Sequence, residues 1–136
     1  FFLTSRQTQH YLAVETLKSI RKKHNVDFGV ADIIGKKWMC MQEVDALPSG
    51  DFIEYCKKLR DENQCEFYLN TRKASRRPTI DAEKNLSELK VLGPLHVGEV
   101  FGHCRKPKLC PYEMVSMLDK DAKVIIADYI QCLIQR

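Results

Sequence analysis

The chain lacks any hydrophobic run approaching the roughly 20 residues that a membrane-spanning helix needs. Its first residues, Phe1 to Thr4, also lack the basic segment that opens a secretory signal peptide. We therefore expect a soluble, cytoplasmic chain that has no membrane partner. An initiator methionine is missing as well, and the chain begins inside an apolar run typical of the end of a strand. We expect it to be an internal fragment.

A strong charge imbalance is also absent. The net charge of +4 permits an anionic partner without requiring one. Hydrophobic residues make up 44% and charged residues 29% of the 136 positions, which is typical of a globular chain with one core or two small ones. No nucleotide-binding loop and no acidic magnesium motif occurs, so any ATPase machinery must lie outside this chain.

The two ends of the chain have the pattern of an α/β protein. Residues 5–24 are expected to form an amphipathic helix, with an apolar face made by Leu12, Ala13, Val14, Leu17 and Ile20. Short apolar, β-branched runs at 26–34 and 122–127 predict buried strands. Before the second strand, residues 111–118 predict a helix with proline at its first position.

The middle of the chain has a different character. Helical stretches at 51–60 and 81–92 are separated by polar segments and by segments that contain glycine and proline. This pattern indicates a mainly helical insertion between the two α/β parts.

Six cysteines are too many for random core filling in a chain of this size. Nothing in the sequence is secretory, so metal or cluster ligation is favoured over a disulfide framework. Four of them are unevenly spaced, without the close pairs of a zinc ribbon, and sulfur ligands suit both zinc and an iron-sulfur cluster. The four cysteines are Cys40, Cys56, Cys65 and Cys110.

Three local strings around these cysteines give a context that the spacing alone lacks, while zinc stays a competing ligand-set interpretation. They read Gly-Lys-Lys-Trp-Met-Cys up to Cys40, Gln-Cys-Glu-Phe-Tyr around Cys65, and Leu-Cys-Pro-Tyr-Glu around Cys110. The chain thereby resembles the iron-sulfur helicases of the XPD family, and archaeal members most. The string Thr-Ser-Arg-Gln-Thr-Gln at residues 4–9 resembles the family's motif Ia, and residues 124–129 resemble the strand after its cluster domain.

The resemblance implies a 4Fe-4S cluster held by Cys40, Cys56, Cys65 and Cys110. It implies part of a RecA-like P-loop helicase motor domain at residues 1–35, the cluster domain at 36–112 and a return to the motor domain at 113–136. The extra thiol of Cys104 is a possible substitute ligand. A buried, inert thiol is the better interpretation of Cys132.

The implied parent protein is an ATP-dependent helicase that moves 5′ to 3′ in DNA repair, with ATP and magnesium bound elsewhere in the parent. Its partners would be single-stranded and forked DNA and the rest of the helicase chain. The cluster domain would act as a wedge between the separating strands. Expected DNA contacts are the motif Ia residues Thr4, Ser5 and Gln7 and the basic residues Lys36, Arg72, Lys73, Arg76 and Arg77.

Two other functions compete with this interpretation. A structural zinc or cluster module that recruits a protein partner would use the same four thiolates. An iron-sulfur nuclease is disfavoured, because metal-dependent cleavage of DNA normally needs clustered carboxylates around magnesium.

Overall fold

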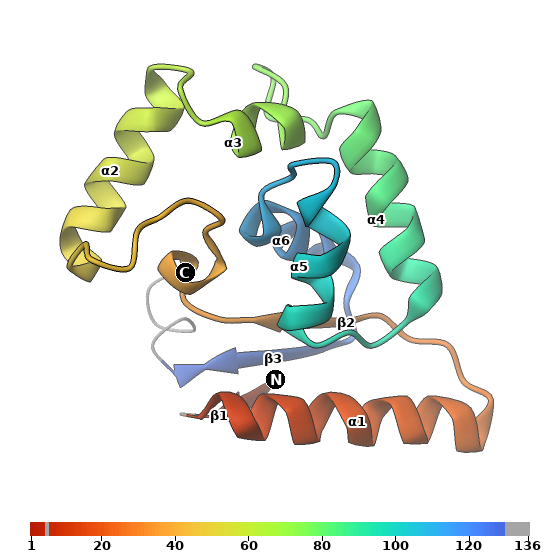
Figure 1. The fold of residues 1–136 in the computed structure, drawn as a ribbon. Helices are drawn as coiled ribbons and strands as arrows, with labels where there is room; N and C mark the ends of the chain where they lie inside the picture. The colour runs from red at the N-terminus through yellow and green to blue at the C-terminus, as the bar shows by residue number, and fades with distance from the viewer. Residues whose placement is uncertain (5, 130–136) are drawn as a thin grey trace.

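The structure is a computed structural model that describes residues 1–4 and 6–129. A short parallel sheet lies at one end of the molecule, and the chain forms a series of helices between the second and third strands of that sheet (Figure 1). In chain order the elements are β1 Phe2–Thr4, α1 Gln7–His24, β2 Val30–Ile33, the 3-10 helix η1 Lys36–Met39, α2 Ser49–Asp61, α3 Glu66–Thr71, α4 Ile80–Leu92, α5 Val97–Arg105, α6 Pro111–Asp121 and β3 Val124–Asp128.

The three strands form one parallel sheet in the order β1-β3-β2. The last strand therefore lies between the first two, with Phe2 opposite Ile126 on one side and Val30 opposite Val124 on the other. Every residue of β2 is buried, which is expected for Val30, Ala31 and Ile33 in a parallel sheet but also includes the carboxylate of Asp32. The strand, helix, strand pattern at the start of the chain is thus confirmed, and so is the strand near its end.

Helices cover the sheet on both sides. In Figure 1, α1 lies along one side and α5 and α6 lie on the other, while α2, α3 and α4 form an arc beyond them. Helix α1 ends at Asn25, whose left-handed backbone conformation (φ 48°) is a common way to stop a helix. The prediction for its apolar face was partly wrong. Leu12 is 64% exposed and Ile20 is 40% exposed, whereas Val14 is fully buried.

One continuous core joins the sheet to the helices of the middle segment. It contains residues of β2 and β3 together with residues of α4, α5 and α6, among them Ile33, Ala127, Leu89, Val100 and Met114. The mixed α/β class is confirmed, with a small parallel sheet and a majority of helices. A RecA-like motor, an inserted cluster domain and boundaries at 1–35, 36–112 and 113–136 stay predictions.

The helices of the middle segment were predicted in part. The stretches expected at 51–60 and 81–92 correspond to α2 and α4, whereas α3 and α5 were not predicted. None of the described helices combines the length and the apolar character that crossing a membrane requires.

Candidate metal centre

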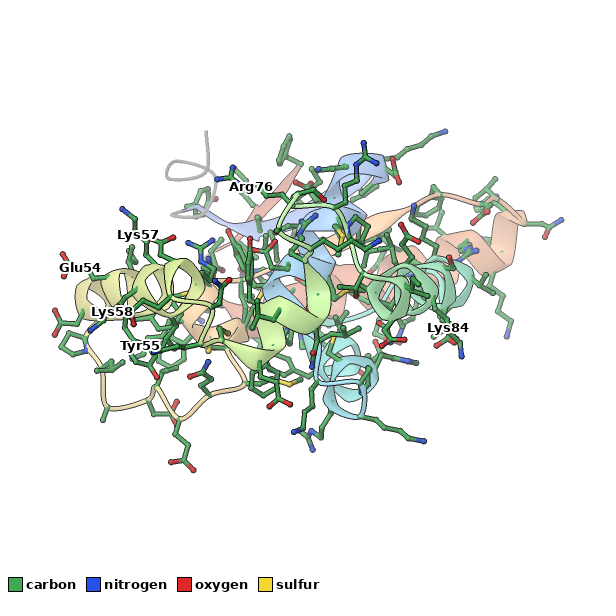
Figure 2. The ribbon with its side chains drawn as sticks, turned by 90° about the horizontal axis from the view of Figure 1, so that it is seen from above. Glu54, Tyr55, Lys57, Lys58, Arg76 and Lys84 are labelled. Atoms are coloured by element: carbon green, nitrogen blue, oxygen red, sulfur yellow. The ribbon has the colours of Figure 1, made fainter. Side chains whose placement is uncertain are left out.

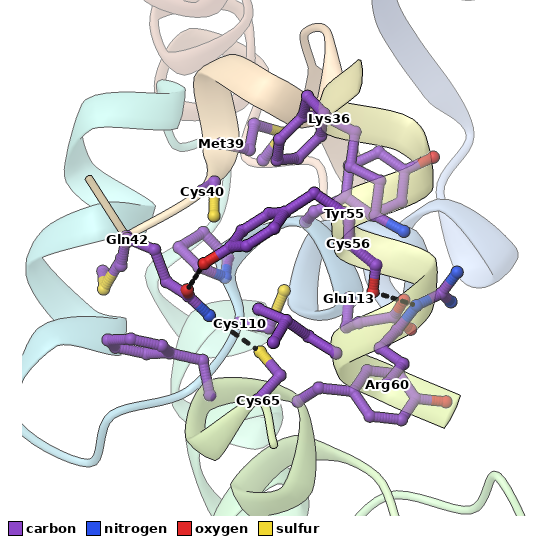
Figure 3. Close-up of a pocket in the computed structure, with 17 residues that line it drawn as sticks. Lys36, Met39, Cys40, Gln42, Tyr55, Cys56, Arg60, Cys65, Cys110 and Glu113 are labelled. Carbon is purple, nitrogen blue, oxygen red and sulfur yellow. Dashed lines mark hydrogen bonds between the residues drawn. The ribbon is translucent and has the colours of Figure 1, made fainter. Parts of the chain in front are cut away.

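Four separate elements bring the predicted ligand cysteines to one cavity. Cys40 follows η1, Cys56 lies within α2, and Cys65 and Cys110 stand immediately before α3 and α6. All four line the same cavity, whose walls are otherwise largely apolar and include Met39, Phe52, Leu59 and Phe67 (Figure 3). The fold therefore gathers thiols that are far apart in the sequence. That they bind a metal stays a prediction.

The backbone around Cys110 is held in place by a buried threonine. The hydroxyl oxygen of Thr71, which is 0% exposed, accepts a hydrogen bond of 2.7 Å from the backbone N–H of Cys110. The same hydroxyl donates to the carbonyl oxygen of Phe67 within α3. Pro111 occupies the first position of α6, so Cys110 is the residue that precedes the N-terminus of this helix. The partial positive charge at a helix N-terminus favours a thiolate.

Burial governs the chemistry of the thiols at this cavity. It raises the pKa of Cys110 to about 12, although the backbone N–H of Glu113 and the charge of Lys36 act in the opposite direction. It also raises the pKa of Cys40, against the backbone N–H of Gln42. Without a cation these thiols are therefore protonated at neutral pH. A metal would have to displace the protons, as thiolate ligation requires.

Charged side chains adjoin the cavity. The ammonium group of Lys36 lies 4.9 Å from the centre of the Tyr112 ring and lines the cavity wall. Close to Cys110, the guanidinium Nε of Arg72 donates to a Glu113 carboxylate oxygen at 2.9 Å, and both side chains are largely buried. Lys36 is thus positioned to offset the negative charge of thiolates. Arg72 is engaged in holding α6 beside the loop that follows α3.

Whether the four thiols would hold an iron-sulfur cluster or a single zinc ion stays a prediction. Zinc binds sulfur at about 2.3 Å, so four thiolates on one zinc must almost touch one another. Across residues 1–4 and 6–129, no three His, Cys, Asp or Glu side chains are arranged to hold one metal ion. A cluster instead distributes its thiolates over separate iron atoms. Cys40, Cys56, Cys65 and Cys110, which line one largely apolar cavity, are the residues that would hold such a cluster.

The remaining two cysteines differ from the four. Cys104 is 0% exposed within the main hydrophobic core, and burial raises its pKa to about 12. It is not among the residues that line the cavity. The prediction that it could replace a ligand therefore has no support from its position. Cys132 lies outside the described residues.

Four of the five basic residues expected to contact DNA lie on a tight loop between α3 and α4, whereas the fifth, Lys36, lies in η1. Backbone hydrogen bonds of 2.8 Å join Lys73 N–H to the Arg77 carbonyl and Arg76 N–H to the Lys73 carbonyl, which close the loop. Lys73, Arg76 and Arg77 are exposed on it. Figure 2 shows Arg76 between α2 and α4, which occupy opposite sides of the view. Three of the four loop cations thus face solvent, and DNA contact by any of them stays a prediction.

The segment predicted as motif Ia joins β1 to α1. Thr4 is only 3% exposed, and its hydroxyl donates to the side-chain carbonyl of Gln9 and accepts from the backbone N–H of Arg6. Gln7 is exposed at the first position of α1. Ser5 lies outside the described residues. The structure therefore leaves Gln7 accessible and uses Thr4 to shape the turn.

A buried charged junction was missed by the sequence reasoning. His10 is 0% exposed, and its Nδ1 lies 2.5 Å from Asp32 of β2 while its Nε2 lies 3.0 Å from Asp128 of β3. The second oxygen of Asp32 accepts a hydrogen bond of 3.0 Å from the backbone N–H of Val97, at the start of α5. One signal was available, since His10 stands four residues before Val14 on the buried side of α1.

The comparison with protein families gave one result that covers nearly the whole chain. Residues 3–136 match the family model DEAD_2. No curated protein matches the chain.

Proposed function

The chain belongs to the DEAD_2 family of DNA-helicase-related domains, found in XPD- and Rad3-type helicases, and on this premise we propose its role. We propose that it is part of an ATP-dependent 5′ to 3′ DNA helicase that works in DNA repair. In this proposal it contributes a 4Fe-4S domain that binds single-stranded DNA and helps to separate duplex strands. ATP and magnesium would bind in other parts of the parent protein.

The convergence of four cysteines on one cavity is the observation that supports this proposal most directly. Cys40, Cys56, Cys65 and Cys110 come from four elements, and their sulfurs face largely apolar side chains. Such a pocket would supply thiolate ligands and exclude water, which protects iron-bound sulfur from oxidation. The bound cluster would link η1, α2, α3 and α6 into one rigid unit, as a strand-separating wedge requires.

The proposed DNA path uses the exposed loop cations and the start of α1. Lys73, Arg76 and Arg77 would neutralise phosphates, and the side-chain amide of Gln7 would bind a phosphate oxygen without reading the base sequence. Four further residues stay proposed DNA contacts: Lys36, Arg72, Thr4 and Ser5. Lys36 lies against the cavity, and Arg72 pairs with the largely buried carboxylate of Glu113. The hydroxyl of Thr4 is hydrogen-bonded within the turn before α1.

Metal analysis tests the proposal at its centre. Protein purified without oxygen should contain iron and acid-labile sulfide in similar amounts, and it should show the broad visible absorption of an iron-sulfur cluster. Stoichiometric zinc without iron would overturn the proposal. A chain that contains a cluster or zinc but binds no DNA at low salt would favour the alternative, a metal module that recruits a protein partner.

DNA binding is tested by the salt dependence of affinity. Replacing Lys73, Arg76 and Arg77 together by alanine should reduce the slope of log affinity against log salt concentration by about 2, because each phosphate that a side chain neutralises on a single strand adds about 0.7 to it. A control variant in which Lys22, Lys23 and Lys84 become alanine removes the same charge from other exposed positions. Equal slopes in the two triple variants would exclude the loop as the DNA-binding surface.

A further inference from the structure

A glutamine that the sequence reasoning did not single out contacts one of the four cysteines. The side-chain Nε2 of Gln42 donates a hydrogen bond of 3.3 Å to the sulfur of Cys65. Its Oε1 accepts a hydrogen bond of 3.1 Å from the hydroxyl of Tyr55, on α2 (Figure 3). The three side chains thus form a relay that runs from an exposed tyrosine to a sulfur at the cavity.

The direction of this relay follows from the chemistry of a thiolate. A thiolate accepts hydrogen bonds and has no proton to donate, so the Gln42 group facing Cys65 must be the NH₂ group. The carbonyl oxygen of the amide then faces Tyr55, whose hydroxyl must be the donor. Ligation of Cys65 therefore selects a single amide orientation, and Tyr55 stabilises that orientation.

Gln42 stands two residues after Cys40 in the chain and lines the same cavity as Cys40 and Cys65. Gln42 is only partly exposed and lines the cavity, so water competes poorly for its amide group.

We propose that Gln42, oriented by Tyr55, is a positioning residue that tunes the Cys65 ligand of the cluster. This inference rests on the proposed function, because it requires a cluster at the cavity. A hydrogen bond to a ligand sulfur stabilises the form of a cluster that bears more negative charge, which is the reduced form. The relay therefore raises the reduction potential and slows the loss of iron at Cys65.

A redox titration of the anaerobically purified holoprotein tests the proposal. Dithionite supplies one electron to each cluster through mediator dyes and is itself oxidised to sulfite, while no bond of the cluster or the protein is made or broken. Gln42→Met keeps the length of the side chain and removes the donor. The equilibrium constant for reduction should fall by up to about tenfold. For a one-electron couple this makes the midpoint potential more negative by up to about 59 mV. Iron loss to a chelator should be several-fold faster.

Tyrosine variants separate the relay from general packing. Tyr55→Phe should shift the potential in the same direction by a smaller amount, because it only loosens the amide. Adding Tyr55→Phe to Gln42→Met should cause no further shift, because Tyr55 acts through Gln42. Tyr68→Phe is the matched control, since Tyr68 lines the same cavity outside the relay and should leave the potential unchanged.

The outcomes distinguish the inference from its premise. A wild-type protein without iron overturns the proposed function, and the inference falls with it. A wild-type protein that contains a cluster, with potentials that are equal in the wild type, Gln42→Met and Tyr55→Phe, overturns the inference alone. If Gln42→Met fails to retain its cluster, Tyr55→Phe decides the question, because it removes one oxygen from an exposed side chain.

Discussion

The cysteine cavity and the His10 junction are two buried polar sites that satisfy their groups in different ways. At the junction, two carboxylates from β2 and β3 contact one imidazole from α1, with N to O distances of 2.5 and 3.0 Å. At the cavity, four thiols face mainly apolar side chains, and burial is the main influence on the pKa of Cys40 and Cys110. At the junction the chain itself supplies both partners of the imidazole, whereas burial at the cavity raises the pKa of Cys40 and Cys110 and so favours their protonated form.

The protonation state of His10 follows from its two partners. Each ring nitrogen of His10 faces a carboxylate oxygen, and a carboxylate that is ionised can only accept a hydrogen bond, so this arrangement favours a hydrogen on both nitrogens. Burial alone would lower the pKa of His10, but the hydrogen bonds and charges of Asp32 and Asp128 outweigh burial and raise it. A buried charge is tolerated where the fold supplies its counter-charge.

The largest effect is expected at the cavity. Cys110→Ser should remove most of the iron, because a serine oxygen is a poor substitute for thiolate on iron, whereas Cys104→Ala should retain it. Iron and sulfide per chain are the measurement. Full iron in Cys110→Ser together with loss in Cys104→Ala would make the core thiol the fourth ligand and would break the contrast between the two cysteines.

The next effect is expected at the junction. Asp32→Asn should lower the free energy of unfolding by about 3 kcal/mol, because it removes one partner of a buried ion pair. It also weakens the acceptor that the Val97 N–H uses at the start of α5. Urea denaturation followed by circular dichroism measures the change. A variant as stable as the wild type would mean that the junction adds nothing to stability.

A smaller effect should appear in the pH dependence of stability. Because the folded-state pKa of His10 is raised above 6.5, its contribution is fully present below about pH 6.5 and is lost as pH rises through the folded-state value. The advantage of the wild type over His10→Gln should fall with rising pH, by at most about 1.4 kcal/mol per pH unit. Urea midpoints measured from pH 6 to 9 test this, and an advantage that grows with pH would contradict it.

The smallest effect is expected for an exposed ion pair that, like the pair of His10 and Asp32, joins a basic side chain to an aspartate. Lys90 contacts Asp121 at 2.6 Å on the surface, where water and salt screen the charges. Asp121→Asn should leave the urea midpoint unchanged in the same assay that detects Asp32→Asn. A loss as large as that of Asp32→Asn would show that burial does not explain the strength of the junction.

Local signals in the sequence predicted much of the fold. The β-branched runs predicted β2 and β3, and Pro111 correctly marked the start of α6. The short helices α3 and α5 escaped prediction because each has too few turns to show a clear period. The apolar face of α1 was misjudged at Leu12 and Ile20, since periodicity does not reveal which side of a helix the sheet will cover.

For the site, the amino-acid sequence was enough to single out four cysteines as candidate ligands, because cysteine type and flanking strings are local properties. Three findings required the packing of the whole chain: the four cysteines line one cavity, Cys104 lies in the core, and Arg72 pairs with Glu113. It alone revealed the contacts of Gln42 with Cys65 and of His10 with Asp32 and Asp128. These contacts join residues far apart in the chain, and their geometry depends on how the sheet and helices pack rather than on any local pattern.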